Sequence, residues 1–373
     1  MDIQEIEAVL KEFVNTDSGT DSKYDVDRFS RLVEAEFLKT GMTVDRVKRE
    51  HVGDILVCHA GCSDKKILLL GHMDTVFPGG PTEVRPFSRR GDMYIGPGVE
   101  DMKGGIVVML FAVRNVLPEL PEEMSLEIIL NTDEETGSVY SKELITEKAK
   151  NAIACLSFEG AKPGTLTTER KGIINFNLSV KGVSAHSGTN YEKGRNAIVE
   201  MAHKISSLSG ITDIENDITF NVGKIQGGSK KNIVPDFVRA ECEVRYFKPE
   251  SRDAIMEKLK HITCKSIIEG TATELEIKNE RPPMDMNNEV KKLFQMAQNE
   301  SIAIGIDIKE RKTGGGGDVS FAAMTGIPAI DGLGPEGENS HTDHEYVLIN
   351  SIPYKIELVS RILRNIFNGG KLK

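Results

Sequence analysis

Two short segments of the chain are almost wholly apolar, Lys66–Leu70 (KILLL) and Leu126–Leu130 (LEIIL). Continuous apolar character over such a length is typical of a strand that is buried on both faces, as in a parallel sheet. Between them, Gly104–Val116 begins with small residues and continues with apolar residues at helical spacing. The order strand, helix, strand therefore predicts an α/β fold.

The middle of the chain has a different pattern. Its strands alternate between apolar and polar residues, which indicates an antiparallel sheet covered by helices on one face. The elements expected there are strands at 174–180 and 237–246 and helices at 197–208 and 252–268.

The length of 373 residues is sufficient for two domains. After the break at 281–283 (RPP), the α/β character returns with a predicted helix near 289–305. We therefore expect one domain formed by residues 1–173 and 286–373, interrupted by a second domain formed by residues 174–285.

The composition is that of a globular protein, with 39% apolar and 28% charged residues. A net charge of -10 disfavours nucleic acid and anionic membranes as partners, because such binding depends on neutralising phosphate. The longest apolar stretch, Ile106–Val113, is far shorter than the roughly 20 residues of a membrane-spanning helix. Five scattered cysteines and an acidic start without the features of a secretory signal predict a reduced, cytoplasmic protein.

Acidic residues and a histidine directly follow three predicted strands. Ligands in open α/β sheets bind beyond the carboxyl ends of strands, so these residues are candidates for a site. They are His72 and Asp74 after 66–70, Asp133, Glu134 and Glu135 after 126–130, and Glu159 after 152–156. In an extended chain His72 and Asp74 point to the same side, so one can bind a metal while the other orients it. A surface turn and a solvated acidic loop are the alternative interpretations.

Two loops supply further candidates. Gly96–Gly105 is dense in glycine, which permits close backbone approach, and its Asp101 could bridge two cations or simply cap the following helix. Asn339–Val347 offers either His341 or His344 as a second imidazole.

Together these residues supply two imidazoles and three or four carboxylates, which is the mixed nitrogen and oxygen ligand set of two zinc or zinc-like ions. Two cations about 3.5–4 Å apart lower the pKa of a shared water and polarise a carbonyl group. The chain has no G-x-S-x-G nucleophile motif. The pattern therefore predicts metal-dependent hydrolysis, in which Glu134 and Glu135 divide proton transfer and metal ligation.

As a set, these motifs resemble the two-zinc exopeptidases and deacylases that include glutamate carboxypeptidase, acetylornithine deacetylase and succinyl-diaminopimelate desuccinylase. The resemblance runs from Gly71–Val76 (GHMDTV) to His341–Val347 (HTDHEYV) and is strongest to the glutamate carboxypeptidase branch. It implies a zinc-peptidase-like α/β/α catalytic domain with an inserted α+β, ferredoxin-like domain that serves as lid and dimerisation domain.

The resemblance also implies roles for individual residues. The metal ligands would be His72 and Glu159 for one zinc ion, His341 and Glu135 for the other, and Asp101 for both. Asp74 would orient His72, Glu134 would be the general base, and the peptide bond after Asp101 would be cis. In this family, glutamate at position 159 goes with carboxypeptidase or deacylase activity and aspartate with aminopeptidases.

In the inserted domain, Val183–Gly188 contains His186, whose imidazole would reach the partner subunit's site and stabilise the developing oxyanion. A structural histidine is the alternative. Asn232 and Arg245 match positions that hold the substrate carboxylate, for which an arginine fork is suited. Gly315 and Gly316 would receive the same carboxylate on their backbone amides, unless the glycine run is only a flexible turn.

The expected function is that of a carboxypeptidase-like hydrolase, which cleaves an amide or peptide bond next to a free carboxylate through a zinc-bridged water. We expect two Zn²⁺ ions, or Co²⁺ or Mn²⁺ in their place, a small peptide or acyl-amino acid substrate, and a homodimer formed through the inserted domain. An N-acyl amino acid deacylase or dipeptidase of the same family is the main alternative. An inactive metal-binding scaffold is a more remote one, and phosphoester hydrolysis is disfavoured because no basic cluster would hold phosphate.

Overall fold

The computed structural model describes residues 2–370, and the chain folds into two compact units. The first comprises Met1–Glu169, Met286–Thr313 and Gly317–Lys373. The second comprises Arg170–Asp285 and Gly314–Gly316.

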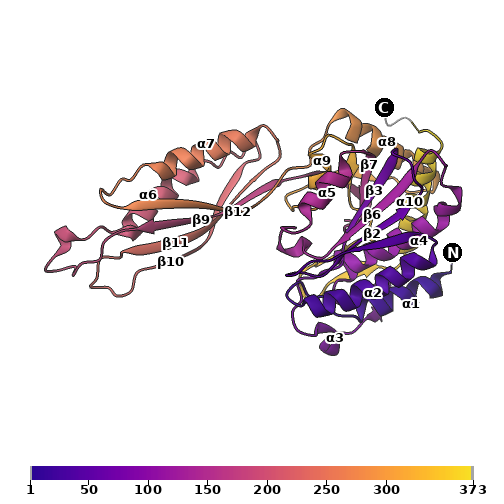
Figure 1. Cartoon of the computed structure of the whole chain (residues 1–373), viewed down its shortest axis with the longest axis horizontal. Helices are drawn as coiled ribbons and strands as arrows, with labels where there is room; N and C mark the ends of the chain where they lie inside the picture. The colour runs from indigo at the N-terminus through magenta and orange to yellow at the C-terminus, as the bar shows by residue number, and fades with distance from the viewer. Residues whose placement is uncertain (1, 371–373) are drawn as a thin grey trace. The chain divides into compact units, whose positions relative to one another are not determined.

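The first unit is built on a six-stranded sheet with the strand order β1-β2-β6-β3-β7-β14 (Figure 1). Its strands are β1 Thr43–Val47, β2 Ile55–Ala60, β3 Lys66–His72, β6 Ser125–Asn131, β7 Ala152–Ser157 and β14 Ala329–Ile330. The last four run parallel to one another, whereas β2 is antiparallel to β6 and β1 to β2. The carboxyl ends of β6, β3, β7 and β14 therefore lie at one edge of the sheet.

Helices cover both faces of this sheet. The elements that share the larger core are α1 Ile3–Val14, α2 Lys23–Lys39, α4 Gly104–Val116, α8 Asn288–Ala303 and α10 Ser351–Phe367. Sheet residues such as Leu69 and Ile128 point into that core. On the other face, α5 Lys142–Ala149 and α9 Val319–Ala323 pack against β7. The predicted α/β/α architecture is confirmed.

A small second sheet of the first unit, with the order β15-β16-β5-β4, places two loops of the site side by side. Its strands are β4 Ser88–Arg90, β5 Met93–Ile95, β15 Gly337–Glu338 and β16 Tyr346–Leu348. Tyr346 pairs with Ile95, so the turn before β16 lies next to the glycine-rich loop after β5. Further elements of this unit are the short helices α3 Pro81–Val84, η1 Val99–Lys103, η2 Leu117–Glu119 and η3 Glu134–Thr136 and the paired strands β8 Thr165–Arg170 and β13 Lys309–Thr313.

The second unit is a four-stranded antiparallel sheet with the order β10-β11-β9-β12. In chain order its elements are β9 Gly172–Lys181, α6 Ala197–Ser209, β10 Thr219–Gly227, β11 Phe237–Tyr246, α7 Ser251–Cys264 and β12 Ala272–Arg281. Both helices cover the same face of the sheet (Figure 1). The elements follow one another in the order βαββαβ, and β10, the strand after the first helix, lies at an edge of the sheet. This is the predicted ferredoxin-like α+β arrangement.

Helix α7 ends at Cys264, four residues before the predicted end at 268. A buried ion pair on α6 explains the early end. The ammonium of Lys204 donates to the carbonyls of Ile262 and Lys265, and the carboxylate of Glu200 accepts from the backbone N–H groups of Ile267 and Ile268. The helical pattern therefore stops where α6 supplies hydrogen-bond partners in place of the next helical turn.

Replacing Lys204 with methionine is expected to destabilise the second unit by about 3–5 kcal/mol, because it leaves Glu200 as a buried charge without its counter-ion. The side chains of Lys204 and Glu200 are 2% and 0% exposed, and their charged atoms lie 3.0 Å apart. Urea unfolding followed by circular dichroism measures the effect. The control is Lys260→Met on the exposed side of α7, which should stay within about 0.5 kcal/mol of the wild type; equal effects of the two substitutions would contradict the prediction.

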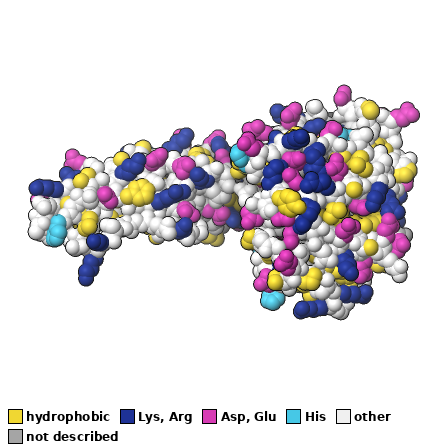
Figure 2. Space-filling model, turned by 60° about the horizontal axis from the view of Figure 1, so that its bottom comes forward, with side chains coloured by type: hydrophobic (Ala, Val, Ile, Leu, Met, Phe, Trp, Pro, Cys, Tyr) yellow, Lys and Arg dark blue, Asp and Glu magenta, His cyan; other side chains and the backbone are white. Residues whose placement is uncertain are grey.

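Within residues 2–370, none of the helices combines the length and the apolarity that crossing a membrane requires. On the face shown in Figure 2, basic side chains lie among acidic ones in both units. The acidic excess is therefore not gathered in a single patch of that face.

Candidate metal centre

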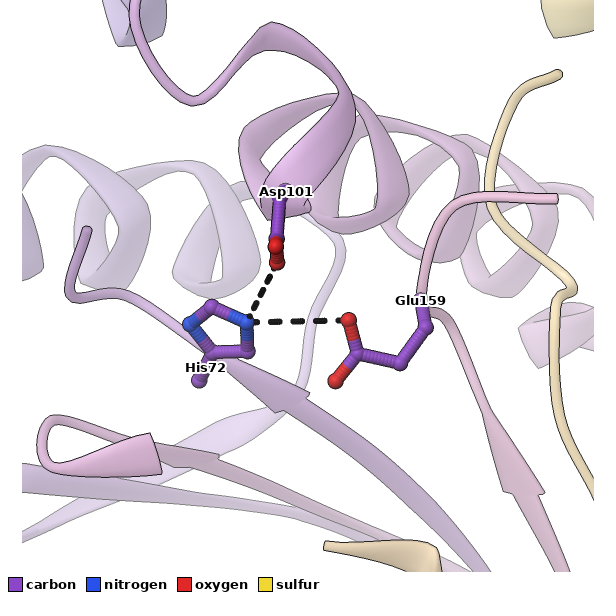
Figure 3. A group of neighbouring side chains, drawn as sticks. All are labelled: His72, Asp101 and Glu159. Atoms are coloured by element: carbon purple, nitrogen blue, oxygen red, sulfur yellow. Dashed lines mark hydrogen bonds and ion pairs between the residues drawn. The ribbon is translucent and has the colours of Figure 1, made fainter. Parts of the chain in front are cut away.

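His72 is the last residue of β3 and is only 1% exposed. Its Nδ1 lies 3.0 Å from the backbone oxygen and 3.4 Å from Oδ1 of Asp74. Its Nε2 faces two carboxylates, at 3.0 Å from Oδ1 of Asp101 and 3.7 Å from Oε2 of Glu159 (Figure 3). Asp74 thus orients the imidazole from one side, and the other nitrogen points between two acidic side chains.

Asp101 connects this group to a second one. Its Oδ2 lies 3.0 Å from Nε2 of His341, and the same nitrogen lies 3.2 Å from Oε2 of Glu135. In each of the two groups, His72–Asp101–Glu159 and Asp101–Glu135–His341, three ligand atoms lie within 4.8 Å of one another and could hold a metal ion. The structure therefore brings all five proposed ligands together, with Asp101 common to both groups, whereas His344 is exposed and belongs to neither.

The elements of the fold explain this convergence. His72, Glu135 and Glu159 lie at or just beyond the carboxyl ends of the adjacent parallel strands β3, β6 and β7. Asp101 comes from the loop before α4, and the peptide bond between Asp101 and Met102 is cis, as the family resemblance implied. His341 comes from the turn before β16, where it has a φ of 64°.

The Asp74 carboxylate also organises the acidic turn after β6. It is 0% exposed and accepts hydrogen bonds from the backbone N–H groups of Glu134 and Glu135, each at 3.2 Å. The hydroxyl of Thr20 donates to it at 2.8 Å. One buried carboxylate therefore positions both the imidazole of His72 and the two neighbouring glutamates, which is a wider role than the sequence predicted.

Burial and the facing carboxylates shift the pKa values of this group. Burial raises the pKa of Glu135 to about 7 and the pKa of Glu159 to about 8. Hydrogen bonds to Asp101 and Glu135 raise the pKa of His341 to about 11. Burial alone would lower the pKa of His72, but the facing carboxylates of Glu159 and Asp101 outweigh burial and raise this pKa well above 6.5. The potential that holds protons on the imidazoles also favours cations, which would displace those protons on binding.

The donor set fits divalent cations of the zinc type. Two imidazole nitrogens and three carboxylates are ligands that zinc accepts. Oε1 of Glu135 is buried and has no hydrogen-bond partner among the described residues, although Oε2 of the same carboxylate faces His341. A buried carboxylate oxygen without a donor is costly unless a cation compensates it, so this atom supports a metal ion beside Glu135.

Sequence reasoning missed one buried residue of this region, Glu345. Its carboxylate accepts backbone N–H bonds from Gly98, Glu100 and Asp101 at 2.8–3.0 Å, and burial raises its pKa to about 7. It lies four residues after His341 in the segment that carries the family resemblance. An acidic residue directly before the apolar Tyr346–Leu348 strand was the only available signal.

The other proposed residues belong to the second unit. Nδ1 of His186 accepts from the backbone N–H groups of Gly188 and Thr189 at 3.1 and 3.3 Å, so in a neutral ring the proton is on Nε2. The backbone oxygen of Asn232 accepts from the N–H of Ser187. His186 and Asn232 therefore lie at the same end of the sheet, beyond Lys181 of β9.

Arg245 lies at the opposite end of that sheet. Its guanidinium forms a two-fold contact with Glu243 at 2.6 and 2.9 Å and donates to the carbonyl of Gly314 at 2.6 Å. The carbonyls of Gly315 and Gly316 accept from Arg170 at 3.3 and 2.6 Å. Two arginines thus hold the glycine run by its carbonyl groups.

The register of β9 against β11 shows how far His186 and Asn232, at one end of the sheet, lie from Arg245 at the other. Ile173 pairs with Arg245, and Lys181 pairs with Phe237. At about 3.3 Å per residue, the stretch between these pairs spans roughly 26 Å.

Comparisons with known proteins agree with the fold and the geometry. Residues 68–365 match the model of peptidase family M20/M25/M40. The chain is 32% identical over 372 residues to carboxypeptidase G2 from Pseudomonas sp. (strain RS-16), covering 96% of this chain and 89% of that protein. It is 24% identical over 316 residues to succinyl-diaminopimelate desuccinylase from Helicobacter pylori (strain J99), covering 80% of this chain and 78% of that one.

Among solved structures, a tripeptidase from Staphylococcus aureus superposes with a TM-score of 0.82 at 25% identity and covers 99% of both chains. The match of the family model over most of the chain, together with the relative at 32% identity, establishes the family that the motifs predicted. The chain is thus a metal-dependent hydrolase that belongs to peptidase family M20/M25/M40.

Proposed function

We propose that this protein is a dinuclear zinc hydrolase of the carboxypeptidase type, which removes an amino acid with a free carboxylate from a peptide or acyl group. His72 and Glu159 would hold one ion, His341 and Glu135 the other, and Asp101 both; Co²⁺ or Mn²⁺ could take the place of zinc. The observation that carries the proposal is the convergence of two ligand groups on the single carboxylate of Asp101.

When bound, a pair of cations polarises a carbonyl group and lowers the pKa of a water molecule. The residues of the chain supply the proton transfers. Glu134 belongs to neither ligand group among the described residues, yet its backbone is held next to them by Asp74. Glu134 is therefore suited to take a proton from the attacking water and pass it to the departing amine.

Recognition of the substrate carboxylate is proposed for Arg245, Asn232, Gly315 and Gly316. The two-fold pairing of Arg245 with Glu243 supports a guanidinium whose orientation is already set. Glutamate at position 159 and the identity to carboxypeptidase G2 favour a carboxypeptidase over an aminopeptidase. The desuccinylase relative and the tripeptidase structure keep an acyl-amino acid deacylase or a di- or tripeptidase as the second candidate.

The proposed roles of His186 and Arg245 require two copies of the chain. A small substrate cannot contact both residues of one copy, because roughly 26 Å of sheet separates their ends of the second unit. We propose a homodimer formed through residues 174–285, in which Nε2–H of the partner subunit's His186 donates a hydrogen bond to the developing oxyanion. We also propose a cytoplasmic location, because the five cysteines are free thiols and the cytoplasm keeps thiols reduced.

The test is a zinc titration of the metal-free protein followed by a substrate panel. We expect calorimetry to give two equivalents per chain. We expect the loaded protein to hydrolyse peptides and acyl-amino acids with a free carboxylate, with glutamate, aliphatic and basic side chains as arms of the panel. One equivalent of zinc, or two equivalents without any hydrolysis, would reject the proposal, and the second result would favour a metal-binding scaffold.

Amidating the carboxylate of the best substrate is expected to lower kcat/KM by about 10- to 100-fold, which corresponds to one or two charge-assisted hydrogen bonds. A matched substrate whose free amino group is acetylated should be hydrolysed at a similar rate. The reverse pattern, in which acetylation is harmful and amidation is tolerated, would identify an aminopeptidase.

A further inference from the structure

We propose that Glu345 is a positioning residue, which holds the backbone of Asp101 so that its two carboxylate oxygens face the two ligand groups. The inference rests on the proposed metal centre and deepens it. Glu345 is in neither ligand group of the described residues, so its proposed role is to position a ligand and not to bind a cation.

Three backbone N–H groups of the loop before α4 converge on the Glu345 carboxylate. Oε1 accepts from Glu100 at 2.8 Å and from Asp101 at 3.0 Å, and Oε2 accepts from Gly98 at 2.8 Å. Glu345 is 0% exposed. Because both oxygens accept these hydrogen bonds, the carboxylate is held against the loop.

The loop needs such an acceptor because its backbone departs from helical geometry at Gly98 and Asp101. Asp101 has φ -120° and ψ 89°, and Gly98 has a φ of 71°. A Cβ on Gly98 would lie 2.7 Å from Cγ2 of Thr75, so the loop also packs closely against the segment after β3. Backbone N–H groups outside a helix or a sheet need another partner when they are buried, and Glu345 is that partner.

The turn before β16, which carries both His341 and Glu345, contacts Asp101 at two points. His341 faces Oδ2 of Asp101 at 3.0 Å, and Glu345 accepts from the N–H of Asp101. The turn is anchored by the pairing of β16 with β5, which begins at Tyr346, directly after Glu345. Together with His72 on Oδ1, these contacts restrict both the backbone and the side chain of Asp101.

Glu345→Gln tests the proposal with little change of volume. A glutamine amide presents an NH₂ group where one carboxylate oxygen now accepts, so it opposes at least one of the three N–H donors. Because Asp101 belongs to both ligand groups, the affinities for both cations should fall, each by about 10- to 100-fold, the usual effect of removing a group that orients a ligand. The readout is zinc affinity in competition with a chelator, measured on wild type and variant.

The matched control is Glu200→Gln in the second unit. Glu200 is also 0% exposed and also accepts backbone N–H bonds, from Ile267 and Ile268. It should lower thermal stability and leave both zinc affinities unchanged. Unchanged zinc affinities in Glu345→Gln, or a loss confined to one of the two ions, would overturn the proposal.

A measurement on the wild type alone covers the case in which Glu345→Gln does not fold. In metal-free protein, hydrogen exchange at the amides of Gly98, Glu100 and Asp101 should be slow, because each donates to Glu345. Fast exchange at these three amides would overturn the proposal. A wild type that binds fewer than two zinc ions would instead reject the proposed metal centre itself, so the two failures are distinguishable.

Discussion

Glu134→Gln is expected to lower kcat by about 10²- to 10⁴-fold, the usual contribution of a general base, while both zinc ions stay bound. The amide has nearly the shape of the carboxylate but cannot accept a proton from the attacking water. Glu134 lies outside both ligand groups, and its backbone N–H is held by Asp74, so the substitution should not disturb the metal centre.

Steady-state kinetics on the best substrate, with zinc content measured on the same samples, checks this expectation. Glu122→Gln, on the exposed turn before β6, is the matched control and should retain full activity. Equal activity of Glu134→Gln and wild type would show that another group moves the proton. Loss of zinc together with activity would show that Glu134 is a ligand.

Asp101→Ala is expected to remove high-affinity binding of both zinc ions, and with it all measurable hydrolysis. Its two oxygens face His72 and His341 at 3.0 Å each, so the substitution takes one ligand from each group at once. A zinc site with only two protein ligands left is weaker than the three-ligand minimum seen in catalytic sites. The loss should therefore exceed that caused by any substitution of a residue in only one group.

Zinc titration by calorimetry measures the outcome for Asp101→Ala, for His72→Ala, which affects one group, and for Asp92→Ala, an exposed control. We expect two equivalents for the control, a change at one ion for His72→Ala, and no tight binding for Asp101→Ala. Retention of one tight ion in Asp101→Ala would mean that Asp101 serves a single cation.

Local patterns in the sequence were sufficient for much of the fold. The apolar segments at 66–70 and 126–130 became the central parallel strands β3 and β6, because a run of large apolar side chains is stable only where both faces are covered. The boundary of α7 was wrong, because its last expected turn is replaced by contacts with Glu200 and Lys204 on a different helix. Such contacts leave no periodic signal.

The candidate site, too, could be predicted from local sequence only in part. His72, Glu135 and Glu159 could be grouped from their positions in the sequence, since the ends of adjacent parallel strands meet at one edge of a sheet. The choice of His341 over His344 came only from the family resemblance. In the folded chain, the reach of His341 to Asp101 and Glu135 distinguishes them.

By itself, the sequence determined the α/β class, the inserted antiparallel unit and the acidic, histidine-containing ends of the central strands. These follow from interactions between residues that are near in the chain, or from a general rule about parallel strands. For Asp101 the sequence left bridging and helix capping open, and the tertiary structure places its carboxylate in both ligand groups. Only the tertiary structure decided that Glu345, 244 positions away, holds the backbone of Asp101. The reason is physical: those contacts depend on the pairing of β16 with β5, and hydrogen bonds between such distant residues have no counterpart in local sequence.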